Sequence, residues 1–583
     1  MDINNKKFVV SSALLLSALN LFNSQPVFAA FAMKLAHRPV AILQVFTPGL
    51  SSAQQADKKL IELKESSRDL DFNQTLHVRI EEKYNGYPVM GANGIIHIPH
   101  AGKSKQTLNE IIAAADKNGS INGMLYQNLD TDLADGLSKV RSGEQQKKAV
   151  EKIRIEWRAQ NNSHGLFLDE ESKEMVIYVD KAQKAHWAYK INFLLESANK
   201  LLARPVYIVD AMTLTNYAQW DSNIAMMRSD NVDRISKPDF ANNKISFSQQ
   251  SNNEPAVEEV KVGGYGGNKR SGKIIYDGFY YPQLTMLRDA SSGTCYLSNS
   301  TVIVKDDYTR KRVETSCPKS DPYHPNIYWN GSFDAVNGGY SPANDALYAG
   351  TVITQMFQKW YGISALQEPD GQPMKVMIYV HANTDYDLDE SLLLVGDGNG
   401  SSHPFTSLPV IAFLFGFDYT SQHSNFPFYD RSESAAIAFA FSAMTAQAVN
   451  YFAYHKTDWQ VGAEISKDGK AMHYLDQPSK DCNGKNPGQY CHIDSANQYY
   501  KYLWQGYACG PYEHAFYLLA TIPGWNIKKA YDVMLKANQH YWVRDINFTD
   551  GACGVINAAK DYGYDTAAVS KAFDAVDIDT SDC

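Results

Sequence analysis

The spacing of apolar residues changes along the chain, from the two-residue period of strands to the longer period of helices. Strand-like alternation occurs early, and the segments that carry it cover 76–80, 94–98, 187–194 and 206–210. A charged helical pattern lies between them, at 143–158. From about residue 344 the apolar positions recur at helical spacing, which predicts helices over 345–361, 435–454, 512–519, 527–538 and 566–573. Strands first and helices later predict an α+β fold with a helical C-terminal lobe.

Composition marks a boundary near the middle of the chain. Residues 246–259 are polar and acidic, and residues 263–268 are rich in glycine, a combination that predicts a solvated linker. The chain of 583 residues is longer than a single domain usually is, and its 44% apolar residues can fill more than one core. Its net charge of -9 argues against a nucleic-acid partner, since binding phosphates requires a basic face.

The N-terminus has the pattern of a signal peptide. Lys6 and Lys7 precede an apolar run over 8–22, and the small residues Ala29 and Ala30 offer a cleavage site. An uncleaved membrane anchor is the alternative, and the shortness of the run argues against it. No other stretch is judged long and apolar enough to span a membrane. We therefore predict a secreted, soluble protein that passes through the periplasm and keeps no membrane contact after signal cleavage.

All seven cysteines lie in the second half of the chain, which agrees with export to an oxidising compartment. Joining nearest neighbours gives three candidate disulfides, Cys295–Cys317, Cys482–Cys491 and Cys553–Cys583. Cys509 is then left over, although the sequence alone does not fix the connectivity. A metal site made of cysteines is the alternative, and the absence of a C-x-x-C pair argues against it.

Several segments resemble parts of one protein family, and they occur in the same order as in that family. They include HVRIEEKYNGYPVMGANGIIHI from His77, WAYKINFLLESANKLLARPVYIVD from Trp187, VGGYGGNKRSGKIIYDG from Val262, WNGSFDAVNGGYSPANDALYAG from Trp329 and YEHAFYLLATIPGWNIKKAYDVML from Tyr512. The chain resembles precursors of the thermolysin-like neutral zinc metalloproteases, in particular their pseudolysin-like branch, where the pair Cys553–Cys583 has a counterpart. The resemblance implies a bacterial exported protein with a two-lobed thermolysin-like domain, β-rich in its N-terminal lobe and helical in its C-terminal lobe. A thermolysin-type and PepSY-like propeptide should precede that domain.

On this basis the chain divides into five parts. We predict a signal peptide over 1–30, a propeptide over 31–252, a linker and maturation boundary over 253–268, an N-terminal lobe over 269–410 and a helical C-terminal lobe over 411–583.

The resemblance also locates the positions where the family carries its chemistry. Its H-E-x-x-H motif binds zinc through two histidines on one helix face, and its glutamate acts as general base. In this sequence the two histidine positions fall on Phe413 and Phe417, and the glutamate position falls on Leu414. The third zinc ligand falls on Ile437 when counted forward without a gap, or on Phe439 when counted back from the following helix. None of these side chains can bind a metal.

The remaining family positions are replaced as well. The histidine that stabilises the transition state falls on Gly506, its partner aspartate on Trp504 and the substrate-binding arginine on His473. The aspartate that orients a zinc ligand falls on Ala443. The family's calcium carboxylates fall on Pro409, Gln447, Asn450 and Asp458, of which only the last is acidic. We therefore predict no catalytic residue, no zinc and no calcium at the family's sites.

Other polar residues do not form a clear substitute for the family's catalytic residues. His97 and His100 are interpreted as surface histidines near a turn, and Glu513 and His514 as residues with a structural or solvating role on a helix. Cys509 is interpreted as a buried structural thiol, with a cysteine nucleophile as the alternative.

These observations predict a catalytically inactive peptidase homologue that acts by binding. An inhibitor, a paralogous protease or a host protein would be its partner. The alternatives are an active secreted zinc metalloendopeptidase with a rebuilt metal site, and a hydrolase of another kind that uses Cys509.

Overall fold

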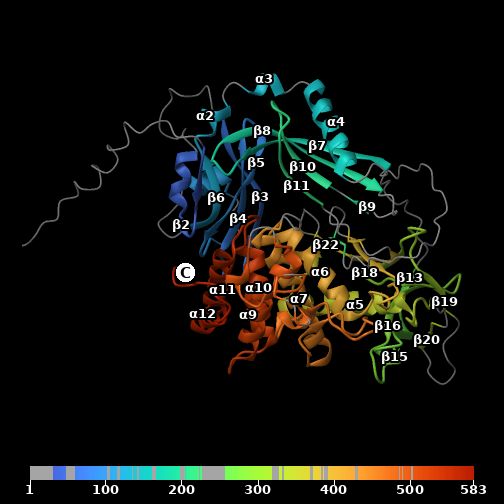
Figure 1. Cartoon of the computed structure of the whole chain (residues 1–583). Coiled ribbons are helices and arrows are strands. Elements are labelled where there is room, and N and C mark those ends of the chain that lie inside the picture. Colours follow the sequence, from blue (N-terminus) through green and yellow to red (C-terminus); the bar gives the residue numbers. More distant parts are fainter. Residues whose placement is uncertain are drawn as a thin grey trace, which may run out of the picture. The chain divides into compact units, whose positions relative to one another are not determined.

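The structure is a computed structural model of the chain, and it describes residues 30–46, 60–101, 106–113, 119–133, 136–140, 143–160, 166–196, 202–203, 205–221, 224–225, 257–317, 327–330, 334–367, 372–382, 385–386, 392–426, 431–482, 484, 486–488, 490–500 and 503–583. The chain forms two compact units, and each is described by itself (Figure 1). The first covers Met1–Gly165, Glu170–Asn192 and Tyr207–Gln219, and the second covers Leu166–Asp169, Phe193–Val206 and Trp220–Cys583. The predicted signal peptide, apart from Ala30, lies outside the described residues.

An eleven-stranded sheet lies mainly, though not entirely, within the ranges of the first unit. Its strands are β1 (Phe31–Lys34), β2 (Arg38–Pro39), β3 (Ile61–Leu70), β4 (Leu76–Tyr84), β5 (Tyr87–Ile98), β6 (Ser120–Gln127), β7 (Leu166–Val179), β8 (Ala185–Glu196), β9 (Leu202–Ala203), β10 (Pro205–Asp210) and β11 (Asn216–Asp221). The helical segments beside them are η2 (Val40–Phe46), α1 (Leu108–Ala113), α2 (Leu129–Leu133), α3 (Leu137–Val140) and α4 (Gly143–Gln160). The predicted strands within β4, β5, β8 and β10 and the predicted helix within α4 are thus confirmed.

His97 does not lie on the surface, contrary to the prediction. It pairs with His77 across β4 and β5, and the two Nδ1 atoms are 2.8 Å apart. His97 is buried, and burial together with the neighbouring histidine lowers its pKa well below the ordinary value. His100, three residues later, is exposed as predicted. The strand continues further than the turn-like sequence indicated, and it carries His97 into the sheet.

The described part of the predicted linker, from Val257 onward, is largely strand, and residues 246–256 lie outside the described residues. From Val257 the chain forms β13 (Val257–Gly263), which pairs with two neighbouring strands, and then β14 (Tyr265–Asn268). Val262 is fully buried while the acidic Glu258 and Glu259 are exposed. The alternation of valine with charged residues therefore places this segment at a sheet, despite its polar composition.

The first part of the second unit is built from small sheets. A five-stranded sheet has the order β19 (Glu314–Ser316), β17 (Thr294–Tyr296), β16 (Leu284–Asp289), β13 and β20 (Ile327–Trp329). A parallel sheet consists of β18 (Val302–Asp306), β23 (Val376–Ala382) and β25 (Leu392–Gly396). Two-stranded pairs join β14 to β15 (Gly272–Ile275), β12 (Ile224–Ala225) to β24 (Asp385–Tyr386), β21 (Leu366–Gln367) to β22 (Pro373–Met374) and β26 (Gln460–Val461) to β27 (His473–Tyr474).

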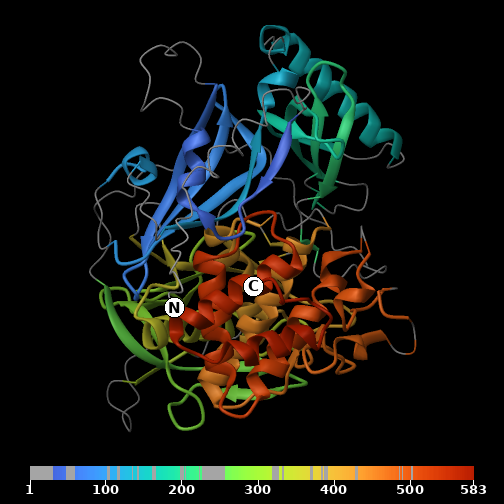
Figure 2. The same ribbon diagram turned by 90° about the vertical axis from the view of Figure 1, so that its left-hand side faces the viewer.

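The helices of the second unit pack into one bundle, visible as the orange-to-red ribbons of Figures 1 and 2. They are α5 (Pro342–Tyr361), α6 (Leu408–His423), α7 (Glu433–Tyr454), η3 (Pro478–Cys482), η4 (Ala496–Gln498), α8 (Gln505–Ala508), α9 (Gly510–Thr521), α10 (Ile527–His540), α11 (Phe548–Tyr562) and α12 (Thr566–Asp574). All five helices predicted from periodicity are confirmed, within α5, α7, α9, α10 and α12. Their apolar faces enclose a single core.

The helix α7 corrects one expectation from the sequence. By length and composition it could cross a membrane, although no second membrane-spanning stretch was expected. Its most apolar window is 83% buried inside the second unit. A helix that is apolar on all sides and surrounded by protein fits the centre of a bundle.

The three cysteine pairs joined by nearest neighbours are disulfides in the structure. Cys509 is the remaining cysteine, and it is buried.

Candidate functional site

Aromatic side chains lie close together at the positions that the resemblance assigns to zinc. Phe413 and Phe417 are four residues apart on α6, so they lie on the same face of the helix. Their ring centroids are 5.1 Å apart in an edge-to-face arrangement, and the ring of Phe439 on α7 lies 4.7 Å from that of Phe417. None of the three is more than 5% exposed, and Leu414 beside them is 3% exposed. Packing of this kind is favourable for aromatic rings and leaves no polar group for a metal.

The position of the third zinc ligand, left open between two residues, is clarified by their contacts. Phe439 packs on Phe417 and so belongs to the aromatic cluster. Ile437 is also buried, but its Cδ1 lies beside Gly551 of α11. Phe439 therefore occupies the place next to the two former histidine positions.

Close packing of α6 on α7 brings these rings together. Gly416 sits within the replaced motif, and a Cβ atom placed on it would lie 2.5 Å from Cα of Ser442. The absence of a side chain at Gly416 lets the two helix backbones approach each other. Gly416 thus allows the aromatic side chains of α6 to pack closely against α7.

The position of the transition-state histidine is also filled. Gly506 is buried, and a Cβ atom placed on it would lie 2.4 Å from the ring of Trp504. That ring in turn lies 5.9 Å from the ring of Phe439. Trp504 therefore takes the space that a histidine at position 506 would need.

The family's calcium and zinc do not fit their former positions. At the calcium position, the Gln447 amide donates to the Gln460 carbonyl over 2.9 Å and accepts from the Thr457 hydroxyl, so its polar atoms are used within the protein. Of the four positions assigned to calcium, only Asp458 carries a carboxylate, whereas calcium needs several charged oxygens. At the zinc position the side chains are hydrocarbons.

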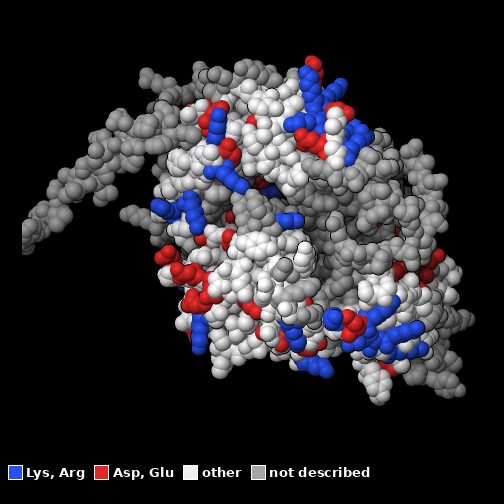
Figure 3. All heavy atoms as spheres, viewed as in Figure 1, with Lys and Arg blue, Asp and Glu red and all other residues white. Residues whose placement is uncertain are grey.

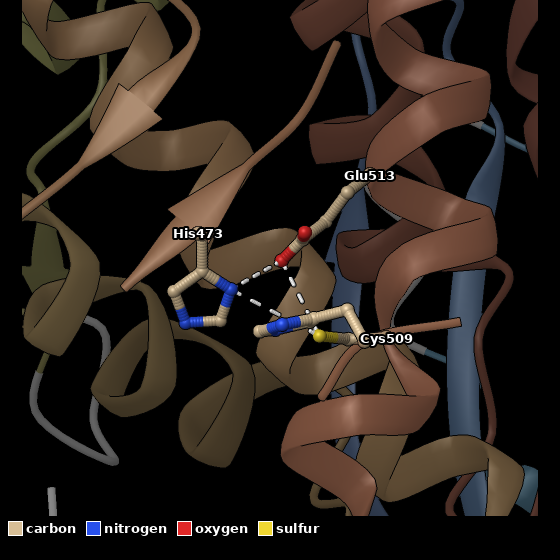
Figure 4. A group of neighbouring side chains, drawn as sticks. His473, Cys509 and Glu513 are labelled. Carbon is tan, nitrogen blue, oxygen red and sulfur yellow. Dashed lines mark hydrogen bonds and ion pairs between the residues drawn. The ribbon is translucent and has the colours of Figure 1, made fainter. Parts of the chain in front are cut away.

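A buried polar cluster lies beside the aromatic rings (Figure 4). Glu513 of α9 accepts a hydrogen bond from His473 of β27, with 2.7 Å between Oε1 and Nδ1. Cys509 precedes α9, and its Sγ donates to the same Oε1 over 3.3 Å. Its Sγ lies 4.0 Å from Nδ1 of His473. The exposed fraction of each side chain is below a tenth.

His492 completes this cluster. One ligand atom from each of His473, His492, Cys509 and Glu513 lies within 4.8 Å of the others. Nδ1 of His492 is 2.7 Å from Oδ2 of Asp481, which also accepts the backbone N–H of His492. The disulfide Cys482–Cys491 joins the residues immediately next to this pair. The covalent link thus holds Asp481 and His492 side by side.

The charges in the cluster are mutually dependent. Burial would raise the pKa of Glu513, but the adjacent His473 and His492 outweigh burial and lower it. Burial would lower the pKa of His492, but the hydrogen bond that its ring donates to Asp481 and the charge of Glu513 raise it. Burial, followed by the Glu513 carboxylate, raises the pKa of Cys509 well above the ordinary value. As a free thiol, Cys509 is therefore protonated and a poor nucleophile.

The aromatic cluster and the polar cluster are in contact through His473. Its ring centroid lies 4.8 Å from that of Phe413 and 4.8 Å from that of His492. The resemblance assigned His473 to the substrate arginine position, and Glu513 was predicted to have a structural or solvating role. No feature of the sequence singled out His492. One signal was available: Cys509 and Glu513 are four residues apart at the start of a helix, where side chains share a face. The two histidines come from a strand and a loop, whose proximity no spacing could reveal.

Comparison with known proteins now identifies the class. The model described as "Thermolysin metallopeptidase, catalytic domain" matches residues 271–415, and "Thermolysin metallopeptidase, alpha-helical domain" matches 426–578. The β-rich first part and helical second part of unit two fit this two-lobed α+β fold, as the sequence predicted. The chain belongs to the thermolysin metallopeptidase family.

Individual members of the family are similar in sequence to this chain over most of its length. Zinc metalloproteinase MspA of Legionella longbeachae is 34% identical over 529 residues, which cover 89% of this chain and 89% of the relative. A zinc metalloproteinase of Legionella pneumophila is 32% identical, covering 88% of this chain and 87% of the relative. The hemagglutinin/proteinase of Vibrio cholerae is 29% identical, covering 87% and 72%.

Proposed function

We propose that this chain is a secreted member of the thermolysin family that has lost peptidase activity and acts by binding. The observation that carries the proposal is the packing of Phe413, Phe417 and Phe439 ring against ring at the positions assigned to zinc. Family catalysis requires a metal-bound water and a general base, and the aromatic cluster offers neither.

Features outside the site support secretion. The chain begins with a signal-like sequence, and its six paired cysteines form the disulfides expected of an oxidising compartment. We further propose that the predicted propeptide, 31–252, stays attached unless another protease cuts near the maturation boundary. An enzyme without activity cannot remove its own propeptide.

A protein partner is the proposed ligand, drawn from inhibitors, paralogous proteases and host proteins. Phe279 and Tyr280 are adjacent and are 89% and 79% exposed. Exposed aromatic residues are enriched at protein interfaces. The face drawn in Figure 3 shows lysine and arginine interspersed with aspartate and glutamate, rather than the continuous basic surface that nucleic acids require.

The activity test uses the full-length secreted protein and fluorescent casein, with and without added zinc. The zinc metalloproteinase of Legionella longbeachae, assayed alongside, is the positive control. We expect no cleavage above that of the heat-treated sample, and one gel band close to full length minus the signal peptide. Anisotropy of a labelled casein peptide, measured on the same samples, should report saturable binding without turnover if the former substrate cleft is the binding surface.

Each alternative gives a different result. Cleavage that a zinc chelator abolishes would overturn the proposal and establish an active metalloendopeptidase with a rebuilt site. Cleavage that resists chelators but is abolished by thiol alkylation would assign a hydrolase to Cys509. The chain could instead bind an inhibitor or a paralogous protease and not casein. That result would leave the proposed loss of catalysis standing, and it would identify a folded protein as the ligand.

A further inference from the structure

We propose that this chain holds a structural zinc site, distinct from the family's catalytic zinc position, whose ligands are His473, His492, Cys509 and Glu513. The inference goes beyond the proposed function, because it assigns a metal to a chain whose catalytic position is filled with phenylalanine.

The distances within the cluster suit one small metal ion. Zinc bonds of about 2.0–2.3 Å in a tetrahedron put ligand atoms roughly 3.3–3.6 Å apart. Here Sγ of Cys509 is 3.3 Å from Oε1 of Glu513 and 4.0 Å from Nδ1 of His473. Nδ1 of His473 and Oε1 of Glu513 are 2.7 Å apart, so a bound ion would only need to separate these two by about half an ångström.

Two buried atoms in the cluster point independently to a ligand. Among the described residues, Oε2 of Glu513 and Nε2 of His492 are inaccessible to solvent and have no hydrogen-bond partner. The Glu513 side chain is 0% exposed and His492 is 4% exposed. Buried polar atoms are almost always satisfied, because leaving one unpaired costs about 1–3 kcal/mol. A metal ion at the centre of the cluster would bind Nε2 of His492 and would draw the Glu513 carboxylate, whose Oε2 is otherwise unpaired, into its coordination shell.

The charges and the chemical types of the four ligand side chains indicate which ion would bind. A thiolate from Cys509 and the carboxylate of Glu513 carry two negative charges, which a divalent cation neutralises, while the two imidazoles bind as neutral ligands. Thiolate and imidazole together favour zinc over magnesium or calcium. Binding would release the thiol proton of Cys509 to solvent.

Asp481 acts as the positioning residue of the site. Its carboxylate accepts the Nδ1 proton of His492, which fixes the ring and leaves Nε2 free to bind. A carboxylate that orients a histidine ligand in this way is a recurrent feature of zinc sites.

The site would be structural and not catalytic. Four protein ligands complete the tetrahedron, whereas catalytic zinc keeps a position for water. All four side chains are buried, so substrate has no access to the ion.

The first test needs no substitution. Because the sequence has seven cysteines and six of them form disulfides, a thiolate-to-metal absorption band can only come from Cys509. The full-length protein is denatured with its disulfides intact, freed of metal by a chelator and refolded with cobalt(II) or zinc(II). We expect about one zinc ion per chain by mass spectrometry and a thiolate-to-cobalt band with the strong visible absorption of a tetrahedral ion.

Substitutions then identify the other ligands. Glu513→Gln and His492→Gln preserve size, and each should weaken zinc binding by at least tenfold, as should Asp481→Asn through the orientation of His492. His514→Gln is the matched control, because His514 neighbours Glu513 in the chain but is not part of the cluster. This control should bind zinc like the unchanged protein.

Two results would overturn the inference. One is refolded protein that takes up no zinc or cobalt; the other is bound metal without a thiolate band, retained in Glu513→Gln. Neither depends on proteolysis. Zinc binding without casein cleavage would uphold both proposals, and casein cleavage by metal-free protein would overturn the proposed function alone.

Discussion

The ring of Phe413 lies 4.8 Å from the imidazole of His473, centroid to centroid, and this contact joins the two halves of the site. The resemblance assigns Phe413 to a zinc-ligand position and His473 to the position of a substrate-binding arginine. In the structure the buried polar side chains gather around β27 and the start of α9, and Phe413 is part of the helical core.

Removing one ring from that core should be costly. Phe417 is 0% exposed and packs against both Phe413 and Phe439. We expect Phe417→Ala to lower the free energy of unfolding by about 3–5 kcal/mol, measured by urea denaturation. The control is Phe279→Ala, whose side chain is 89% exposed and whose loss should change stability by less than about 0.5 kcal/mol. Equal effects of the two substitutions would contradict a packed core at the zinc position.

The close contact between α6 and α7 leads to a second prediction. Alanine is normally favoured over glycine inside a helix by about 1 kcal/mol. At Gly416, however, the added Cβ would meet the backbone of Ser442 at 2.5 Å, and backbone cannot rotate away. We therefore expect Gly416→Ala to lower the melting temperature, with a cost of roughly 1–3 kcal/mol. Gly400→Ala, where an added Cβ meets nothing within 4 Å, should be neutral, and a stabilised Gly416→Ala would refute the close contact.

The periodicity of apolar residues predicted much of the helical part of this fold from the sequence alone. Apolar spacing predicted the long helices α5 and α7, which the structure confirms. The loss of zinc ligands stays a prediction from the resemblance, which places Phe413 and Phe417 at the motif. The burial of His97 could not be predicted, because it depends on pairing with His77 across two strands. The polar cluster was missed for the same reason. Its members are brought together by tertiary packing, and each alone resembles an ordinary core residue.

The buried carboxylate of Asp345 should make stability depend on pH. Asp345 lies in the first turn of α5 and accepts hydrogen bonds from the Tyr276 hydroxyl and the Gly267 N–H. Burial raises its pKa from 3.8 to about 7, despite the opposing effect of those hydrogen bonds. The folded state then binds more protons than the unfolded state between these two values. The free energy of unfolding should therefore fall as pH rises from 4 to 7, by on the order of 4 kcal/mol, and level off above.

The substitution Asp345→Asn isolates this effect. Oδ1 accepts from both donors, and Oδ2 also accepts the Gly267 N–H over 2.9 Å. An asparagine with its oxygen at the Oδ1 position keeps a hydrogen bond to each donor without titrating, and it gives up only the second contact to Gly267. Hydrogen exchange of α5 amides, followed by mass spectrometry at pH 5 and pH 8, should show protection that falls with pH in the unchanged chain. The difference between the two pH values should shrink in the variant. An identical pH dependence in both proteins would assign the effect to other groups.

Finally, the disulfide Cys482–Cys491 should matter more for metal binding than for stability. It closes a loop with a sequence separation of 9, so its loss should cost roughly 2–3 kcal/mol of unfolding free energy. Cys553–Cys583 closes a separation of 30, and its loss should cost more, roughly 3–4 kcal/mol. Only the first disulfide lies next to Asp481 and His492. Replacing its two cysteines by alanine should therefore weaken zinc binding about 10–100-fold, whereas the same change at Cys553–Cys583 should leave the affinity unchanged. If zinc affinity instead followed overall stability, the second variant would be the weaker binder, and the role assigned to the first disulfide would be wrong.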